Sequence, residues 1–323
     1  MRRRTFLRLA GSAGVGFSAL PAVVSAQAPW PNKPVKIIVP FGAGGGTDNL
    51  ARFWAERLGH AFGQPFVVEN RGGASGVIGT EAAAKSAPDG YTLLLSSNSS
   101  TINLPLLRKV PYDPSSLQPV VRVGDAATGF CVHPSTGLKS VKELVEYARA
   151  NPGKLSGCSA GVGTSSHMRM EMLAYRTGVK FLHVPYRGGA DALNDLLAGT
   201  VHFMNDPTCN PSAKAGKLNM LCISHSTRSP EFPDAPTLTE AGYPDSDVPL
   251  WFSIWAPAGM PQPIVEALHA KVTEISRQPD VPSRLLLSGN LPVTSTLAEL
   301  HAFRDANWKA TADLIKVANI KLE

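Results

Sequence analysis

The amino-acid sequence predicts an α/β protein with two lobes, each built on a mostly parallel sheet flanked by helices. Three observations lead to this prediction. The chain has 323 residues, which is more than one hydrophobic core comfortably organises. Short apolar runs alternate with longer amphipathic segments, as in strand–helix–strand units. This alternation occurs in two separate stretches, and the C-terminal part supplies too few strands for a third sheet.

The first stretch begins with an apolar strand predicted at 35–39 and ended by Pro40. The segment 49–59 follows with apolar residues at helical spacing between Leu50 and Leu58, which predicts a helix that buries one face. The other predicted elements of this stretch are strands at 65–70 and 91–96 and a helix at 78–86.

The middle stretch repeats the alternation and is predicted to form a complete α/β lobe of its own. Its predicted strands are 129–133, 155–159, 181–184, 201–204 and 218–224, and its helices are 141–150, 165–176 and 190–198.

The last stretch offers one aromatic strand at 250–257, followed by helices at 263–277, 281–288 and 297–318. One strand cannot form an independent sheet, so we expect it to complete the first sheet. The first lobe then comprises 27–124 together with 228–323, and the second comprises 125–227. Two crossings, near Val123 and Thr227, would form a hinge beneath a ligand cleft.

Residues 1–26 are predicted to be an export signal. A twin-arginine pair, Arg3 and Arg4, precedes a weakly apolar stretch, and small residues at Val24 and Ala26 suit cleavage after Ala26. The alternative is a basic anchor helix, which glycines, a proline and the short apolar run disfavour. We therefore expect a periplasmic protein without a membrane span in its mature part.

Charge and cysteine content exclude several classes of function. The signal holds four of the 31 Lys and Arg residues, which leaves 27 against 25 acidic residues in the mature chain. This near-neutral balance gives no basic surface for nucleic acid. The sequence contains no C-x-x-C pair and no H-E-x-x-H motif, so it predicts no metal site. The pairing of Cys131, Cys158, Cys209 and Cys222 stays open, although buried free thiols in strands suit Cys131 and Cys222.

Two glycine-rich turns, at 41–48 and 159–167, each join a predicted strand to a predicted helix. Glycine lets the backbone approach a ligand closely, and the N–H groups at a helix start bind anions without a charged side chain. A helix cap supplied by Asp48, or by a hydroxyl of the second turn, is the alternative explanation for either turn alone. Because each lobe carries one such turn, we predict that they share one anion site in the cleft.

The first turn also nearly matches a dinucleotide-binding fingerprint. Gly42 and Gly44 fit the G-x-G-x-x-G pattern, and Glu69 ends the next strand, where a ribose-binding acid belongs. Thr47 stands where the third glycine of the pattern should be, and Pro40 interrupts the chain between the predicted strand and the turn. An exported NAD(P)-dependent oxidoreductase is therefore the alternative function. No G-x-S-x-G elbow is present, and we expect neither an enzyme nor a bound cofactor.

The order and spacing of many short motifs resemble the Bug family, the periplasmic substrate-binding components associated with tripartite tricarboxylate transporters. The likeness runs from Trp30 to the C-terminal helix. The matching stretches are 30–34, 39–41 with 45–48, 67–71, 87–93, 150–155, 163–167, 184–188, 215–218 and 256–259. Near the expected site, the loop 206–214 is shorter than the family pattern and Cys158 stands where glycine is common.

The resemblance implies a two-lobed periplasmic-binding-protein fold, type II-like, that closes around a small carboxylate held by the two helix starts. It also implies a monomer that delivers this ligand to a membrane permease of the tripartite tricarboxylate type. A ligand-sensing partner of a signalling receptor is a further alternative. Whether the ligand is a di- or tricarboxylate, an aromatic acid or an amino acid stays open. The ligand-binding residues implied by the family motifs are Phe41, Ala43, Gly45, Thr47, Gly161, Gly163, Thr164, Ser165, His167, Tyr186, Arg187 and Asp206.

Overall fold

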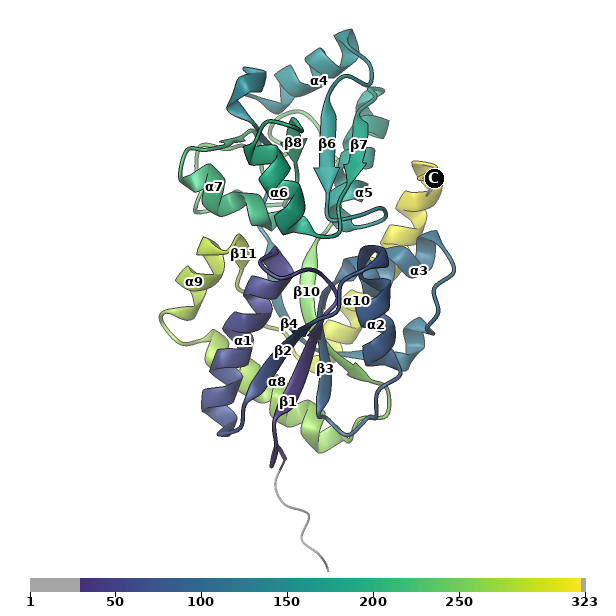
Figure 1. Ribbon diagram of the computed structural model, residues 1–323, viewed down its shortest axis with the longest axis vertical. Coiled ribbons are helices and arrows are strands. Elements are labelled where there is room, and N and C mark those ends of the chain that lie inside the picture. The colour runs from purple at the N-terminus through teal and green to yellow at the C-terminus, as the bar shows by residue number, and fades with distance from the viewer. Residues whose placement is uncertain (1–29, 321–323) are drawn as a thin grey trace, which may run out of the picture. The chain divides into compact units, whose positions relative to one another are not determined.

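Two mixed β-sheets organise residues 30–320, the part of the chain that the computed structural model describes (Figure 1). Each sheet, together with the helices that cover it, forms one lobe. The predicted export signal at 1–26 lies outside the described residues.

The sheet of the first lobe has six strands in the order β11-β4-β10-β3-β1-β2. β1 runs parallel to both β2 and β3, as the strand–helix–strand pattern predicts. β10 runs antiparallel to β3 and β4, and β11 runs antiparallel to β4. The strands are β1 Val35–Val39, β2 Phe66–Asn70, β3 Thr92–Ser97, β4 Leu117–Ala126, β10 Trp251–Pro257 and β11 Asn290–Leu291.

The sheet of the second lobe has five strands in the order β7-β6-β8-β5-β9. β6 pairs in parallel with β7 and β8, whereas β5 is antiparallel to β8 and β9. The strands are β5 Cys131–Val132, β6 Ser156–Ser159, β7 Leu182–Pro185, β8 Phe203–Met204 and β9 Asn219–Met220.

The sheets are therefore mixed, and the expectation that both are mostly parallel holds only for their strand–helix–strand portions. The antiparallel pairs of the first sheet arise because β4 leads out toward the second lobe and β10 leads back, so the two must run in opposite directions. The C-terminal stretch completes the first sheet as predicted, through β10 and the short β11.

The helices lie close to their predicted positions. Within α1, Leu50, Trp54 and Leu58 are fully buried, as their helical spacing predicted. The helices of the first lobe are α1 Gly46–Phe62, α2 Val77–Ala84, α3 Leu104–Leu107, α8 Gln262–Ser276, α9 Val281–Leu287 and α10 Leu297–Val317. Those of the second lobe are α4 Val141–Ala150, α5 Ser165–Thr177, α6 Gly189–Leu197 and α7 Asn210–Lys214.

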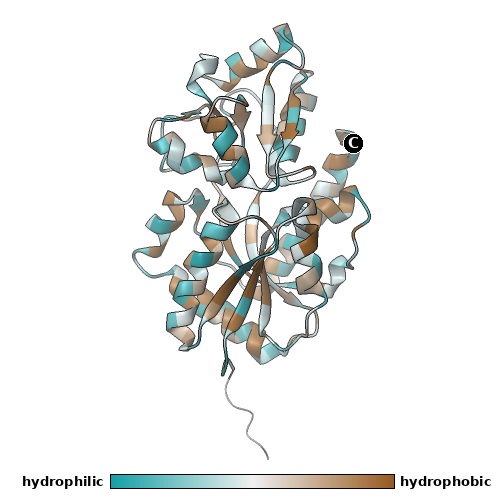
Figure 2. Cartoon of the chain, viewed as in Figure 1, coloured by the Kyte–Doolittle hydropathy of each residue, from teal (hydrophilic) through white to brown (hydrophobic). Residues whose placement is uncertain are grey.

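Each lobe has its own apolar core, and hydrophobic residues concentrate along the strands of the first sheet (Figure 2). In the first lobe, Trp251 and Trp255 of β10 pack against each other and against Ile38 of β1. In the second, Phe203 packs with Leu144 and with Leu238, which belongs to the connection before β10. That packing leads us to place the return crossing between Leu238 and β10, later than the predicted Thr227.

All four cysteines are buried and unpaired. Cys131 lies in β5 as predicted, whereas Cys222 lies just beyond β9. Burial raises the pKa of Cys158 and of Cys222 to about 12, which keeps both thiols protonated. Across residues 30–320, none of the helices is both long and apolar enough to cross a bilayer. The same residues hold no group of three or more potential metal ligands.

Candidate functional site

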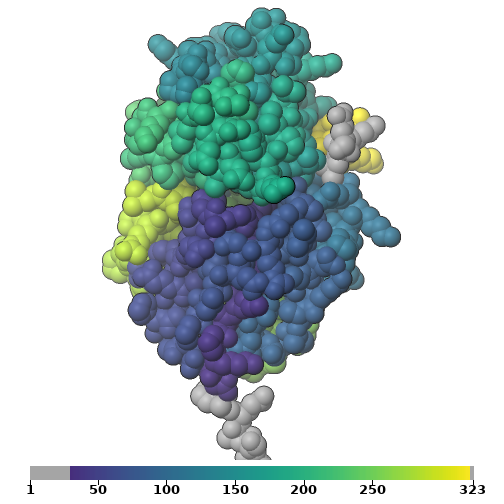
Figure 3. Space-filling view, viewed as in Figure 1, coloured from purple at the N-terminus to yellow at the C-terminus, as the bar shows by residue number. Residues whose placement is uncertain are grey.

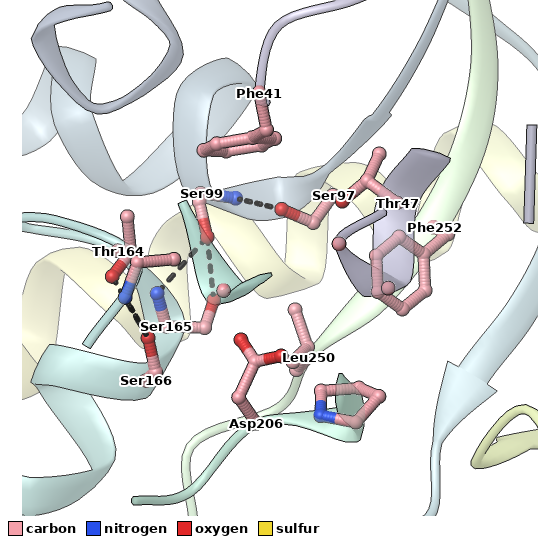
Figure 4. A pocket seen from close by; sticks show the side chains of 15 residues that line it. Phe41, Thr47, Ser97, Ser99, Thr164, Ser165, Ser166, Asp206, Leu250 and Phe252 are labelled. Carbon is pink, nitrogen blue, oxygen red and sulfur yellow. Dashed lines mark hydrogen bonds between the residues drawn. The ribbon is translucent and has the colours of Figure 1, made fainter. Parts of the chain in front are cut away.

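A cavity lies between the two lobes, where residues from both lobes meet (Figure 4). On the face shown in Figure 3, the first lobe abuts the second with no open trough between them. The residues lining the cavity are Phe41, Gly45, Gly46, Thr47, Ser97, Ser99, Ala160, Thr164, Ser165, Ser166, Gly189, Asp206, Pro207, Leu250 and Phe252.

Three helices begin at this cavity, and in none of the three does the side chain of the N-cap residue cap the helix start. The residues at the N-cap position are Gly45 for α1, Thr164 for α5 and Gly188 for α6. Glycine has no side chain that could accept hydrogen bonds from the first amides of the helix. The Thr164 hydroxyl donates instead to the Gly161 carbonyl at 2.6 Å. Amide groups at the starts of α1 and α6 are thus left for another acceptor, with the helix dipole favouring an anion.

The first glycine-rich turn is held in shape by Asp48, one position beyond the cavity lining. Its carboxylate accepts hydrogen bonds from the Gly44 amide at 2.8 Å, from Arg52 Nε at 2.9 Å and from Asn70 Nδ2 at 2.9 Å. Burial acts to raise the pKa of Asp48, but these hydrogen bonds outweigh it and the pKa is lowered. Asp48 therefore stays ionised and fixes the loop, close to the cap role that the sequence left open.

The second glycine-rich turn satisfies more of its own groups. Ser166 Oγ accepts from the Ala160 amide at 3.2 Å, and His167 Nδ1 accepts from the Gly163 amide at 3.1 Å. The His167 ring stacks on that of His183, with 3.9 Å between ring centroids. Burial lowers the pKa of His167 to about 3 and that of His183 to about 4, so both rings are neutral at pH 7.

The lobes touch through small groups around the cavity. The Ser165 amide donates to Ser99 Oγ at 2.9 Å, and Asn103 Nδ2 donates to Ser165 Oγ at 3.0 Å. A Cβ on Gly188 would lie 3.4 Å from the Gly42 nitrogen, so the lobes leave room for little more than a methyl group between these two glycines. The described conformation is therefore a closed one.

Within the described part of the chain, Asp206 is the only ionisable residue that lines the cavity. Its Oδ1 accepts from the Thr208 amide at 3.0 Å and from the Thr208 hydroxyl, which caps the short 3-10 turn that follows. Burial raises the pKa of Asp206, against the opposing effects of Thr208 and of the Arg169 charge. The cavity thus presents backbone amides, hydroxyls and one carboxyl group, with two aromatic rings and Leu250 as apolar wall.

Six of the twelve residues implied by the resemblance line the cavity, and six do not. Those that do are Phe41, Gly45, Thr47, Thr164, Ser165 and Asp206. Ala43 and Arg187 are exposed to solvent, Gly161 packs on Ser75, and Tyr186 donates a hydrogen bond to Asp195 at 2.5 Å. Gly163 and His167 bond to each other behind the second turn. The third wall comes from Gly189, at the start of α6, and not from the Tyr186 and Arg187 side chains.

Residues at the ends of β3 and β10 also line the cavity, and these were not predicted from the sequence. Ser97 and Ser99 lie at the end of β3 and just after it, and Leu250 and Phe252 lie at the start of β10. The hydroxyl-rich run at 96–100, at the end of a predicted parallel strand, is a signal that could have found the first two. Glu69, the suspected ribose ligand, instead pairs with Lys36 at 2.6 Å and lies outside the lining.

The model of a protein family described as the tripartite tricarboxylate transporter family receptor matches residues 50–321. The chain belongs to this family. It is 33% identical to Rpa4515 of R. palustris, solved with adipate, with a TM-score of 0.87 over 90% of this chain and 99% of that one. It is 35% identical to the periplasmic binding protein BugD, with a TM-score of 0.85 over 91% and 100% of the chains. MatC from Rhodopseudomonas palustris, with bound malate, is 30% identical, with a TM-score of 0.83 over 88% and 100%.

These similarities confirm the family resemblance and the two-lobed periplasmic-binding-protein fold predicted from the sequence. Members of this receptor family are periplasmic solute-binding proteins, so the chain is a solute-binding protein by family. Two of the structures named above were solved with small dicarboxylic acids.

Proposed function

We propose that this protein is a periplasmic receptor that captures a small carboxylate in the cavity between its lobes and delivers it to a tripartite tricarboxylate-type permease. The observation that carries the proposal is the convergence of three helix N-termini on one cavity between the lobes, none of them capped by its own N-cap side chain. Among residues 30–320, no Lys, Arg or His side chain lines that cavity, so backbone amides and hydroxyls are the anion-binding groups.

Phe41, Gly45, Thr47, Thr164, Ser165 and Asp206 are the proposed ligand contacts, with Gly189 added at the third helix start. The amides at the starts of α1 and α6, one from each lobe, would share the ligand's carboxylate. A ligand that bridges the lobes makes contacts that exist only when they are closed, and this difference in affinity drives closure. The permease would then recognise the closed receptor.

Family relatives support the chemical class of the ligand. Rpa4515 was solved with adipate and MatC with malate, both carboxylic acids that carry two carboxylate groups. The dinucleotide alternative has less support, because Glu69 is engaged by Lys36 and by Arg71 away from the cavity.

A thermal-shift screen of the chain from Gln27 onward tests the proposal. The screen contains dicarboxylic, tricarboxylic and aromatic acids, amino acids, NAD and NADP. A ligand at a hundred times its Kd stabilises the native state by about 2.7 kcal/mol, which raises Tm by a few degrees. We expect a shift with one class of carboxylate. A shift with NAD or NADP alone would instead favour the oxidoreductase alternative, and no shift with any carboxylate would contradict the proposed function.

A further inference from the structure

We propose that the lobes rotate about one residue in each crossing, Ala127 on the outward crossing from β4 to β5 and Pro249 on the return crossing into β10, and that Arg169 of α5 confines the second bend to Pro249. The inference rests on the proposed function only in that capture of a ligand closes the lobes.

On the return crossing, two successive carbonyl groups are bound to opposite lobes. The Val248 carbonyl accepts a hydrogen bond from Arg169 Nε of the second lobe at 2.8 Å, and the Val248 side chain packs with Met168 of the same helix. The Pro249 carbonyl accepts from Asn98 Nδ2 of the first lobe at 3.0 Å. Because peptide groups are planar, only the φ and ψ angles of Pro249 lie between the two bound groups.

The proline ring removes one of these two angles from the motion. It fixes φ at about −65°, so rotation at this residue is left to ψ. Pro249 is exposed to solvent, so packing in a core does not hold it in place. The return crossing is therefore expected to bend about one bond.

The outward crossing shows the same division at Ala127. The Ala127 amide donates to the Gly289 carbonyl of the first lobe at 2.9 Å, whereas its carbonyl accepts from Asn210 Nδ2 of the second lobe at 3.1 Å. The hydroxyl of Thr128 donates to Asn210 Oδ1 at 2.8 Å, which keeps the following residue with the second lobe. The attachment of the chain thus passes from one lobe to the other within Ala127.

The two pivots are held next to each other. The Ala126 amide donates to the Leu250 carbonyl at 2.8 Å, and each of these residues is the neighbour of one pivot on its first-lobe side. Two adjacent pivots define one axis, so we expect the lobes to turn as rigid bodies while few backbone angles change.

Arg169 keeps the return crossing attached to the second lobe as far as Val248. It is 1% exposed and does not line the cavity. Its guanidinium also donates to the Ser224 carbonyl at 3.0 Å and to the Asn205 side chain at 3.1 Å, and Asp247 lies 3.6 Å from Nε. Arginine presents its donors in a rigid fork, which lysine does not reproduce. Arg169 is thus a positioning residue that acts on the hinge without touching the ligand.

Double electron–electron resonance between spin labels on the two lobes measures the rotation. The labels are attached to the chain from Gln27 onward at Glu56→Cys on α1 and Glu146→Cys on α4. Both positions are exposed, and the four native cysteines are buried. Distances are recorded without ligand and with the carboxylate that gives the largest shift in the thermal-shift screen.

Pro249→Ala releases the fixed φ angle and should broaden the distribution of interlobe distances in the ligand-free receptor. It should also raise the Kd of that carboxylate about 2- to 5-fold, because closure then has to fix an angle that proline fixes in advance. Ala127→Gly should act in the same direction. Pro244→Ala is the matched control, since Pro244 is an exposed proline of the same connection that precedes Val248 and so belongs to the second lobe. It should change neither the distances nor the Kd.

Arg169→Lys keeps the positive charge but loses the three-way fork, so the bend should spread into the residues before Val248. We expect a broader distance distribution than in the wild type. If this variant lowers Tm and leaves the distances as they are, Arg169 is only structural and its positioning role is wrong. Should it fail to fold, hydrogen exchange of 245–248 in the wild type decides. Exchange there should be as slow without ligand as with it, and faster exchange without ligand would contradict the role.

The remaining outcomes separate this inference from the proposed function. Wild-type distance distributions in both Pro249→Ala and Ala127→Gly would overturn the assignment of the pivots, as would equal broadening by Pro244→Ala. If no carboxylate changes the interlobe distance, the proposed function fails, while the widths measured on the ligand-free variants still decide where the chain bends.

Discussion

The three helix starts at the cavity are built differently from those of α4 and α10, which lie away from it. In α4, Ser140 Oγ accepts from the Glu143 amide at 3.1 Å, and in α10, Thr296 and Glu299 form a complete capping box. At the cavity, α1 and α6 have glycine in the same position, and the threonine that precedes α5 directs its hydroxyl elsewhere. The protein thus closes the starts of α4 and α10 with its own oxygens and leaves those of α1 and α6 at the cavity for an external acceptor.

The two glycine-rich turns at the cavity also differ from each other. The second turn engages several of its amides internally through Ser166, His167 and Ser99. The first turn uses Asp48 to satisfy Gly44 but leaves the amides of Gly46 and Thr47 at the start of α1 without a side-chain cap from the N-cap residue. We therefore expect the first lobe to provide the stronger anion-binding surface and the second lobe to provide a rigid opposing wall.

Supplying the missing cap at α1 should have the largest effect on ligand binding. Gly45 has φ −76° and ψ 168°, which aspartate adopts readily at an N-cap, and a Cβ there meets nothing closer than 3.6 Å among the described residues. Gly45→Asp should raise the ligand Kd at least about 100-fold, which is about 2.7 kcal/mol of binding free energy. The reason is that the aspartate carboxylate would occupy the place of the ligand's carboxylate. Titration calorimetry measures the loss.

Gly45→Ala is the matched control, since it adds the Cβ without an acceptor and should weaken binding far less. The free energy of unfolding of Gly45→Asp should stay within about 0.5 kcal/mol of wild type or rise. Retention of wild-type affinity in Gly45→Asp would mean that the ligand does not use the start of α1.

The neutral His167 gives the second turn a dependence on pH. Its pKa is about 3 in the folded protein and about 6.5 when unfolded, so the unfolded chain binds the proton first on acidification. Its contribution to stability is complete above about pH 6.5 and is lost as the pH falls from there toward 3. At pH 5 the loss is about 2 kcal/mol relative to pH 7.5.

Urea unfolding at several pH values measures this slope. His167→Asn keeps an acceptor within reach of the Gly163 amide but cannot titrate, so its stability should fall less between pH 7.5 and pH 5. His183 titrates in the same direction and Glu171 lies 3.6 Å from His167 Nε2, so part of the slope should remain. Equal slopes in the variant and the wild type would contradict the assignment to His167.

Removing a cap far from the cavity should give the smallest effect. Ser140→Ala deletes the acceptor of the Glu143 amide and should lower the free energy of unfolding by about 1 kcal/mol. Ligand affinity should not change, because α4 packs on the second lobe's core and contributes none of the described lining residues. A change in Kd beyond about 2-fold would show that the two kinds of helix start are not independent.

The sequence was informative wherever the signal is local. Helix spacing in α1 and α4 and the apolar run of β1 placed those elements within a few residues, and the glycine turns pointed to two of the three helix starts. β4 was missed because Pro119 and Gly124 interrupt a run that otherwise alternates like a strand. The direction of β10 could not be predicted either, because it depends on where the chain returns from the second lobe.

The cavity itself was harder to predict because it forms only where the lobes meet. Leu250 and Phe252 carry no sequence mark that separates a cavity wall from ordinary core. Tyr186 and Arg187 lie next to the correct helix start, yet their side chains point elsewhere, since the backbone at Gly188 and Gly189 occupies the close approach to the first turn. Asp206 was implied by the family motif and not by its local sequence.

The glycine contacts around the cavity have a consequence for how the receptor switches. Gly42 faces Gly188 and Gly45 faces Gly189, and glycine brings no apolar side chain to either place. Hydrophobic stabilisation scales with the apolar area removed from water, so these glycines by themselves favour the closed form only slightly. Apolar contact between the lobes comes instead from a cluster outside the cavity lining, in which Met168 and Met172 of α5 pack with Leu107 and Leu314 of the first lobe. A ligand with about 10⁴-fold preference for one form moves a two-state equilibrium from 1:99 to 99:1. At the glycines, where the protein itself supplies little apolar area, the ligand's own contacts supply that preference.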